Sequence, residues 1–356
     1  MGRIIGGAYV RNLPNPHRAA PKLELSAPYP SVEASRVADL LAHCPAAHET
    51  PLIATSGLAP VAQLLVKDER TRMNLGSFKA LGAAYVIARH AAEVAPSPDA
   101  TTLQGRTYVT ASAGNHGMSV AAGARIFGAG AVIYIADTVP ESFADRLKAQ
   151  DAQVVRAGAD YAASMEAAME VAQSNSWILL SDSSWEGYVE LPHILMEGYL
   201  QMAAEAARQC PEPPTHIMLQ AGVGGLAGAV AAYARKVWGG APRIIVVEPE
   251  SAPALQASIQ AGKCVFADGP DSIMGRLDCK EPSLIALNGL ARDADDFLTL
   301  TDDEVAEHLP ALAQAGLATT ASGGAGVAAV LREDVRDALH IGGDSRVLCF
   351  LSETVE

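Results

Sequence analysis

The chain has 356 residues, of which 49% are hydrophobic and 19% are charged, and 40 acidic against 26 basic residues give a net charge of −14. This is ordinary globular composition, in a chain long enough for two lobes with cores of their own. The acidic balance argues against nucleic-acid or anionic-membrane partners, because both need a basic surface, and no run approaches the roughly 18 apolar residues of a membrane span.

The first fifty residues contain many prolines and predict an irregular segment that wraps the surface. The beginning, MGRIIGGAYVRNLPNPH, lacks an apolar core followed by a small-residue cleavage site, so we expect no signal peptide. The five cysteines are scattered and form no CxxC pair, which fits reduced thiols in the cytoplasm. A disulfide between Cys264 and Cys279 remains an alternative.

Further along the chain, apolar runs alternate with Ala-rich stretches. The apolar runs predict buried strands at Leu64–Lys67, Tyr108–Thr110, Val132–Ile135, Ile178–Leu180, Ile217–Leu219, Ile244–Val247 and Val347–Leu351. The Ala-rich stretches predict helices at Phe78–His90, Met118–Phe127, Tyr161–Gln173 and Leu226–Val237. This alternation predicts an α/β fold with mostly parallel sheets covered by helices on both faces.

The segment MNLGSFKALGAAYVIARH predicts a loop that enters a helix, with Ser77 as the N-cap. Lys79 would lie in the first turn, where a cation is unfavourable because the helix dipole is positive there. Burial and this positive potential would lower the pKa of Lys79 and free its amine as a nucleophile. The alternative is a solvated surface lysine.

In TYVTASAGNHGMSVAAGARIFG, a predicted strand passes through SAGNHG into a helix. The glycines let backbone N–H groups approach a ligand closely, and a helix N-terminus favours an anion such as a carboxylate. The amide of Asn115 can both donate and accept. A capped turn without a ligand is the alternative, and for His116 a structural role is favoured over a catalytic one.

In THIMLQAGVGGLAGAVAAYARK, the loop Gly222–Leu226 joins a strand to a helix. Such a loop can hold a phosphate on its backbone N–H groups. Gly222, Gly224 and Ala227 also satisfy G-x-G-x-x-A, and the next strand ends at Glu248. A dinucleotide-binding unit would have the same pattern, so an NAD-dependent dehydrogenase stays open at this point.

A fourth segment, LATTASGGAGVAAVL, places Ser322 before a Gly-rich helix start, where an N-cap is the ordinary role. In order and spacing, the four segments together resemble the tryptophan-synthase-β-like family of pyridoxal-phosphate (PLP) enzymes, fold type II, over residues 48–352. The resemblance implies a two-lobed fold, each lobe a mostly parallel sheet flanked by helices.

The resemblance also implies roles for the residues at matching positions. Lys79 would carry PLP as a Schiff base, with Phe78 beside the cofactor, Ser322 facing its pyridine nitrogen and Asn115 near its ring hydroxyl. The phosphate would be held by Gly222, Val223, Gly224, Gly225 and Leu226. The substrate carboxylate would be bound by Ser112, Ala113, Gly114, Asn115 and His116.

Within this family, three segments are most similar to the diaminopropionate ammonia-lyases: SDSSWEGYVELPHILMEGY, SIMGRLDCKEPS and VVEPESAPAL. The similarity implies that Asp182 is an active-site aspartate in contact with the substrate. Ala113 departs from the pattern, because the lyases have an aspartate before GNHG that is thought to serve the D-isomer. The exact substrate and leaving group are therefore left open.

The sequence thus predicts a PLP-dependent lyase that performs α,β-elimination on a small L-amino acid and releases a 2-oxo acid and ammonia. A dehydratase of threonine, serine or 3-hydroxyaspartate, a β-replacement synthase, and a catalytically inactive amino-acid-binding protein are alternatives. We expect a large domain from residues 1–70 and 190–356 and a small one from 71–189. We also expect a cytoplasmic homodimer with no metal site.

Overall fold

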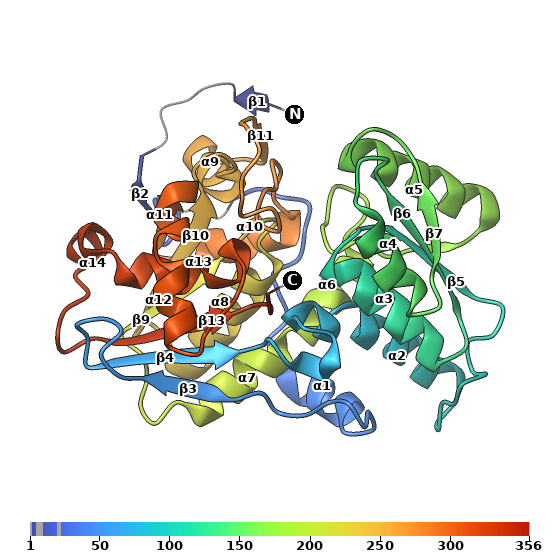
Figure 1. The fold of residues 1–356 in the computed structure, drawn as a ribbon, viewed down its shortest axis with the longest axis horizontal. Coiled ribbons are helices and arrows are strands. Elements are labelled where there is room, and N and C mark those ends of the chain that lie inside the picture. The colour runs from blue at the N-terminus through green and yellow to red at the C-terminus, as the bar shows by residue number, and fades with distance from the viewer. Residues whose placement is uncertain (1, 5–9, 20–22, 356) are drawn as a thin grey trace.

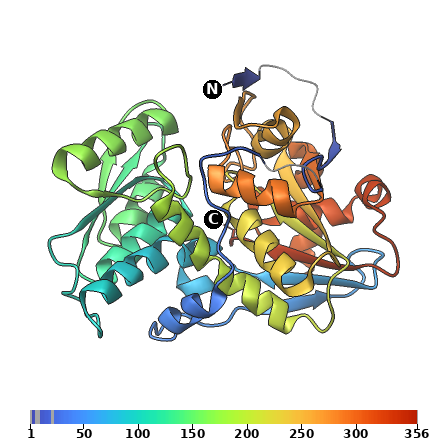
Figure 2. The same cartoon turned by 180° about the vertical axis from the view of Figure 1, so that it is seen from behind.

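The chain forms two lobes that lie side by side, each built around its own sheet (Figures 1 and 2). The computed structural model describes residues 2–4, 10–19 and 23–355. Both sheets are mainly parallel and are flanked by helices, which confirms the predicted α/β class. No helix in the described part of the chain is long and apolar enough to cross a membrane.

The large lobe contains a seven-stranded sheet. In spatial order its strands are β2 (Asn12–Pro14), β12 (Asp296–Leu300), β10 (Arg243–Pro249), β9 (His216–Gln220), β13 (Arg346–Leu351), β4 (Gln63–Asp68) and β3 (Leu52–Thr55). The five central strands are parallel, and the two edge strands, β2 and β3, are antiparallel to their neighbours. The central strands are apolar along their length because both faces are covered.

Alternate residues of these strands enter two separate cores. Ile217 and Leu219 pack on one face and Met218 on the other, as the two-residue period of a strand requires. The first face is covered by α7 (Leu200–Gln209), α8 (Gly225–Trp238), α9 (Ala254–Ala261) and α10 (Leu284–Asp293). The second face is covered by α11 (Asp302–Ala306), α12 (Leu309–Gln314), α13 (Ala321–Leu331) and α14 (Glu333–Leu339).

The small lobe contains a four-stranded parallel sheet. Its order is β7 (Gln153–Arg156), β6 (Gly130–Ile135), β5 (Thr107–Ala111) and β8 (Ile178–Leu179). One face is covered by α2 (Ala83–Val94), α3 (Asn115–Ile126) and α4 (Glu141–Lys148), and the other by α5 (Tyr161–Asn175). The connections place the loop after β5 and the start of α3 on the side that faces the large lobe (Figure 1).

The N-terminal segment is more regular than its prolines suggested. Within its described residues, β1 (Gly2–Ile4) pairs with β11 (Val265–Ala267), β2 joins the large sheet, and Ala34–Leu41 form α1. Strands this short cannot be predicted from sequence, because two or three paired residues leave no periodic pattern. Tertiary pairing supplies their hydrogen bonds instead.

The predicted helix at 78–90 is interrupted at Gly82. A 3₁₀ turn, η2 (Phe78–Leu81), precedes α2, and a second one, η1 (Arg72–Asn74), lies just before it. A Cβ on Gly82 would lie 2.9 Å from the hydroxyl of Tyr199, so only glycine permits this packing. The domain boundaries at 70/71 and 189/190 stay a prediction, since α1 and α6 (Glu190–Gly198) each contact elements of both lobes.

Candidate active site

Lys79 lies in η2, between the two lobes. Ser77 accepts a hydrogen bond from the backbone N–H of Lys79, which confirms the predicted cap. The Lys79 ammonium forms an ion pair with Asp182, which follows the last strand of the small sheet. Nζ also lies 5.4 Å from the ring centroid of Phe78, and that ring packs against Tyr199 at 4.9 Å between centroids.

The charges of Lys79 and Asp182 stabilise each other. Burial alone would lower the pKa of Lys79, but the negative charge of Asp182 outweighs it and raises that pKa. Burial would likewise raise the pKa of Asp182, but the charge of Lys79 holds it well below the usual range. The expected lowering of the Lys79 pKa is therefore wrong for this arrangement, because the sequence did not reveal how close Asp182 lies.

The predicted carboxylate loop follows β5 and leads directly into α3. Ser112 accepts a hydrogen bond from the N–H of Gly114 at 3.3 Å, which closes a tight turn. A Cβ on Gly117 would lie 2.2 Å from the carbonyl oxygen of Ser112, so a glycine is required there. His116 is buried and bonds through Nε2 to the carbonyl of Leu180 at 2.8 Å, a structural contact. Ala113 contributes no titratable group.

The predicted phosphate loop joins β9 to α8, a helix of 14 residues. Gly224 has φ +96°, a left-handed conformation that favours glycine. A Cβ on Gly222 would lie 2.9 Å from Sγ of Cys279, and one on Gly224 would lie 2.9 Å from Cβ of Ala286. The loop therefore brings backbone without side chains to the N-terminus of α8. The N–H groups and the helix dipole at this end favour the binding of an anion.

Ser322 is not an N-cap. Thr320 caps α13 instead, accepting a hydrogen bond from the N–H of Gly323 at 2.9 Å, and Ser322 lies inside the first turn. The buried hydroxyl of Ser322 accepts from the backbone N–H of Arg276 at 3.0 Å. A helix beginning two residues earlier than expected frees this hydroxyl to face the loop that carries Arg276.

The loop around Arg276 connects the other predicted segments. A Cβ on Gly114 would lie 3.0 Å from Nη1 of Arg276, and one on Gly222 would lie 3.0 Å from its carbonyl oxygen. The structure thus brings the carboxylate loop, the phosphate loop and Ser322 around one short segment. Lys79, Phe78 and Asp182 form a second group. Cys279, whose Sγ lies 2.9 Å from the Cβ position of Gly222, is close enough for the charges of Asp182 and Lys79 to influence the pKa of its thiol.

Four residues of this region were missed by sequence reasoning: Tyr199, Arg276, Cys279 and Glu353. Arg276 and Cys279 belong to SIMGRLDCKEPS, a segment noted only as a family signature. Tyr199 is the last residue of SDSSWEGYVELPHILMEGY, another segment of that kind, and Glu353 had no local signal. Cys264 and Cys279 are both free thiols, so the alternative disulfide is not present, and burial raises the pKa of Cys279 to about 11.

The environment of Glu248 argues against a dinucleotide-binding site. Its two carboxylate oxygens accept hydrogen bonds from the N–H groups of Leu255 and Gln256 at 2.7 and 2.8 Å, at the start of α9. The side chain is fully buried, and burial raises its pKa to about 8. Glu248 is therefore engaged in the fold and cannot bind the hydroxyls of a ribose.

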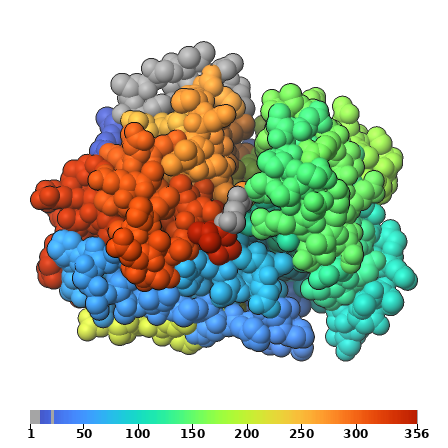
Figure 3. All heavy atoms as spheres, viewed as in Figure 1, coloured from blue at the N-terminus to red at the C-terminus, as the bar shows by residue number. Residues whose placement is uncertain are grey.

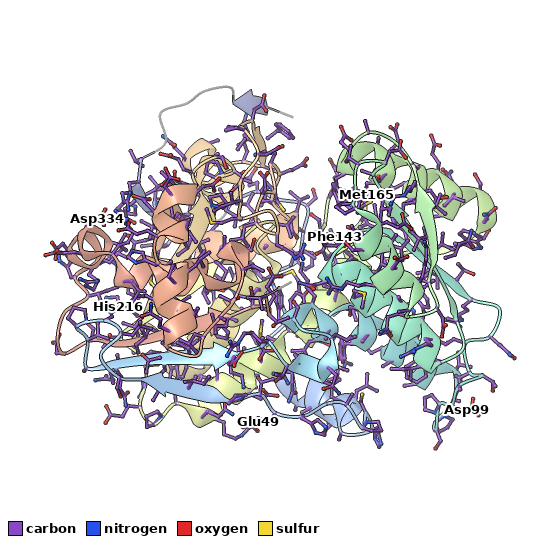
Figure 4. All side chains as sticks on the ribbon, viewed as in Figure 1. Glu49, Asp99, Phe143, Met165, His216 and Asp334 are labelled. Atoms are coloured by element: carbon purple, nitrogen blue, oxygen red, sulfur yellow. The ribbon has the colours of Figure 1, made fainter. Side chains whose placement is uncertain are left out.

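A surface hollow elsewhere has no part in this site. It is lined by Arg332, Asp334 and Asp337, and Figure 4 shows Asp334 at the end of the large lobe away from the small one. Among the described residues, no group of three or more His, Cys, Asp or Glu side chains is arranged to hold a metal ion. The predicted functional residues thus gather between the lobes.

Comparison with known proteins agrees with this geometry. The family model described as pyridoxal-phosphate dependent enzyme matches residues 44–353. Diaminopropionate ammonia-lyase of Escherichia coli K12 is 35% identical over 277 residues, which cover 72% of this chain and 69% of that protein. L-threonine ammonia-lyase of Thermotoga maritima is 27% identical over 289 residues, covering 80% and 67%.

A crystal structure of the E. coli diaminopropionate ammonia-lyase, in complex with an aminoacrylate-PLP azomethine reaction intermediate, superposes with a TM-score of 0.83. It is 28% identical, and the match covers 96% of this chain and 93% of that one. The match therefore includes both lobes as well as the segments between them. This chain belongs to the family of pyridoxal-phosphate-dependent enzymes.

Proposed function

We propose that this protein catalyses α,β-elimination on a small L-amino acid, with 2,3-diaminopropionate as the first candidate substrate. Loss of ammonia from Cβ gives 2-aminoacrylate, and water converts this to pyruvate and a second ammonia. The observation that carries the proposal is the partly buried carboxylate of Asp182 beside the amine of Lys79. The match to diaminopropionate ammonia-lyase supports the same reaction.

The residues between the lobes fit PLP. The glycine loop from Gly222 to Gly225 suits a phosphate, since it leads into the N-terminus of α8, where backbone N–H groups favour an anion. The hydroxyl of Tyr199 is buried beside Lys79 without a hydrogen-bond partner among the described residues. This hydroxyl is therefore available to form a hydrogen bond with a bound ligand. When bound, PLP would serve as the electron sink that makes the Cα proton acidic.

We assign the cofactor contacts as the family resemblance implies. Lys79 would hold the cofactor's aldehyde carbon, with Phe78 against its ring. Ser322 would face the ring nitrogen with a neutral hydroxyl, and Asn115 would lie near the ring hydroxyl. The phosphate would be held by Gly222, Val223, Gly224, Gly225 and Leu226.

The substrate contacts follow from the remaining charges. The N-terminus of α3, with Ser112, Gly114 and Asn115, would bind the α-carboxylate. Lys79 must be neutral to remove the Cα proton, which would leave the charge of Asp182 unpaired. A β-ammonium group would restore a cation beside Asp182, and this favours 2,3-diaminopropionate over serine or threonine.

A dehydratase is the second candidate. Ala113 stands where the lyases have an aspartate, and one relative of this chain is an L-threonine ammonia-lyase. A hydroxyl leaving group would need a proton, which Asp182 could donate. Ammonia and 2-oxo acid release from 2,3-diaminopropionate, L-serine, L-threonine and 3-hydroxyaspartate separates the two candidates.

The test of the assignment is borohydride reduction of the purified holoenzyme, followed by peptide mapping. We expect PLP to be fixed to Lys79, and Lys79→Ala to lose the visible absorption band and at least about 10³-fold in kcat. Lys148→Ala, at an exposed ion pair on α4, is the control and should retain both. PLP found on another lysine would overturn the site.

We also propose that the protein acts in the cytoplasm as a homodimer. The described cysteines are all free thiols, which supports a reducing compartment. Light scattering at micromolar concentration, with a chain mass of 37.0 kDa, would distinguish a dimer from a monomer.

A further inference from the structure

The segment that follows β13 lies where the two lobes meet, and its dark red spheres are visible there in Figure 3. Glu353 forms an antiparallel bridge with Ser77, two residues before Lys79. The flanking Ser352 accepts a hydrogen bond from the N–H of Phe78 at 3.1 Å, and the N–H of Thr354 donates to Gly76 at 2.9 Å. The backbone of this segment is thus held firmly against the lysine loop.

The side chain of Glu353 is buried, at 5% exposure, and its carboxylate accepts from three different segments. Oε2 accepts from Nδ2 of Asn115, at the start of α3, and from Nε of Arg276 at 3.0 Å. Oε1 accepts from the hydroxyl of Thr320, the N-cap of α13. The side chain of Glu353 therefore connects the loop Ser112–His116, the loop that carries Arg276 and the start of α13.

These bonds fix the direction of two groups. The amide nitrogen of Asn115 carries two N–H groups, so it can donate one to Glu353 and the other to an anion. Nε of Arg276 is held by Glu353, and Nη1 of Arg276 lies 3.0 Å from the Cβ position of Gly114. Both groups then lie at the N-terminus of α3, where an anion is favoured.

We propose that Glu353 is a positioning residue for the amino-acid carboxylate site, because it holds Asn115 and Arg276 in place at the start of α3. Arg276 is the additional group that binds the substrate carboxylate there. This inference rests on the proposed function, since it needs an amino acid to bind beside Lys79.

The experiment compares two amines on the PLP-loaded enzyme, followed by the change in cofactor absorbance and fluorescence. L-alanine has an α-carboxylate but no leaving group, and ethylamine has no carboxylate. For Glu353→Gln we expect the Kd of L-alanine to rise by about tenfold or more, as for loss of charged hydrogen bonds. The Kd of ethylamine should change less than about twofold.

Two controls separate positioning from a structural role. Thr320→Val removes the other donor to Glu353 and the cap of α13, so it should lower the melting temperature but leave the affinity for L-alanine intact. Glu304→Gln alters another carboxylate of the same lobe that is paired with an arginine, since Glu304 bonds to Arg11 at 2.6 Å. This substitution should change the Kd of neither amine. Equal weakening of both amines by Glu353→Gln, or loss of L-alanine binding in Thr320→Val, contradicts the proposal.

If Glu353→Gln does not fold, Arg276→Gln provides the same test. This substitution should raise the Kd of L-alanine but not that of ethylamine. An unchanged Kd for L-alanine would overturn the inference and leave the proposed function standing. A wild-type enzyme that takes up no PLP, or responds to neither amine, would overturn the proposed function and this inference with it.

Discussion

Lys79 and Asp182 each set the proton affinity of the other in the folded protein. The charge of Lys79 is the largest influence that keeps the pKa of Asp182 low against burial, with His116 contributing less. If Lys79 gives up its proton or its charge, burial prevails and Asp182 takes up a proton more readily. Asp182 can therefore change protonation in step with Lys79, as expected of a group that contacts the leaving atom.

Ala113 leads to a prediction about stereochemistry. Lys79 can remove a Cα proton only on its own side of the substrate, so elimination from a D-amino acid needs a second base on the opposite side. In the lyases that base is thought to be the aspartate before GNHG, and Ala113 cannot replace it. General bases commonly contribute about 10²–10⁴-fold in rate. We expect kcat/KM to favour the L-enantiomer of every accepted substrate, with 2,3-diaminopropionate measured first.

The matching gain-of-function variant is Ala113→Asp, which should raise kcat/KM for the D-isomer more than for the L-isomer. Comparable values for both enantiomers in the wild-type enzyme would refute the argument. They would point to Asp182 as the second base, and Asp182→Asn would then lose the D-reaction preferentially.

Residues in local motifs were predictable, whereas residues that reach the site from distant segments were not. Lys79, Asn115 and Gly222 stand in glycine-rich or capped turns whose local chemistry indicates a ligand. Glu353 meets Asn115 across 238 residues of sequence, so no local pattern could pair them. The misplacement of Ser322 as a cap has a similar cause, because both Thr320 and Ser322 have side chains suited to the role.

At the scale of elements, most central strands were predictable, although the buried strand β12 was missed, and most edge strands were not, although β8 was predicted. β9 and β10 are buried on both faces, and their apolar runs mark them plainly. The edge strand β3 is only partly buried, and β2 contains a proline, so neither has a continuous apolar pattern. Their pairing depends on neighbours supplied by the rest of the fold.

The turn between β9 and α8 leads to a prediction about the cofactor. Gly224→Asp would place a Cβ 2.9 Å from Ala286, strain a backbone with φ +96°, and add a negative charge beside a phosphate. We expect PLP affinity to fall at least about 100-fold, measured by absorbance titration. The strain should also lower the thermal stability of the protein.

The control for this strain lies at the other end of the same helix. Gly239 has φ +60°, but a Cβ there would meet nothing within 4 Å. Gly239→Ala should therefore lose some stability while keeping its affinity for PLP. Normal PLP occupancy in Gly224→Asp would show that the loop does not hold the phosphate.

At the scale of the whole molecule, a buried ion cluster fastens the lysine-bearing segment to the large lobe. Glu205 of α7 accepts from Lys67 of β4 at 2.7 Å and from Arg72 of η1 at 2.6 Å. Arg72 also pairs with Glu69 at 2.7 Å, and Thr50 bonds to both carboxylates. All these side chains are nearly inaccessible to solvent, and the surface Glu49 lies just outside them, below α7 in Figure 4. The chain from β4 to η1 is thus held in place as far as Arg72, five residues before Ser77.

Glu205 should therefore dominate the acid stability of the protein. Burial would raise its pKa, but hydrogen bonds and charges from Arg72 and Lys67 lower it to about 2. Because the folded pKa lies below the unfolded value of about 4.3, this stabilisation is fully present above pH 4.3 and is lost as the pH falls toward 2. Glu205→Gln should cost about 3–5 kcal/mol in urea unfolding of the cofactor-free protein at pH 7.

The difference in unfolding free energy between wild type and Glu205→Gln should shrink by about 1.4 kcal/mol for each pH unit below 4.3, because the wild-type carboxylate then takes up a proton on unfolding. Glu212→Gln is the control, since that carboxylate is 67% exposed and lies 3.5 Å from Arg346. Its effect should stay within about 0.5 kcal/mol at every pH. A difference between wild type and Glu205→Gln that stays constant from pH 7 to pH 3 would show that packing of this side chain, and not its charge, stabilises the junction between β4, η1 and α7.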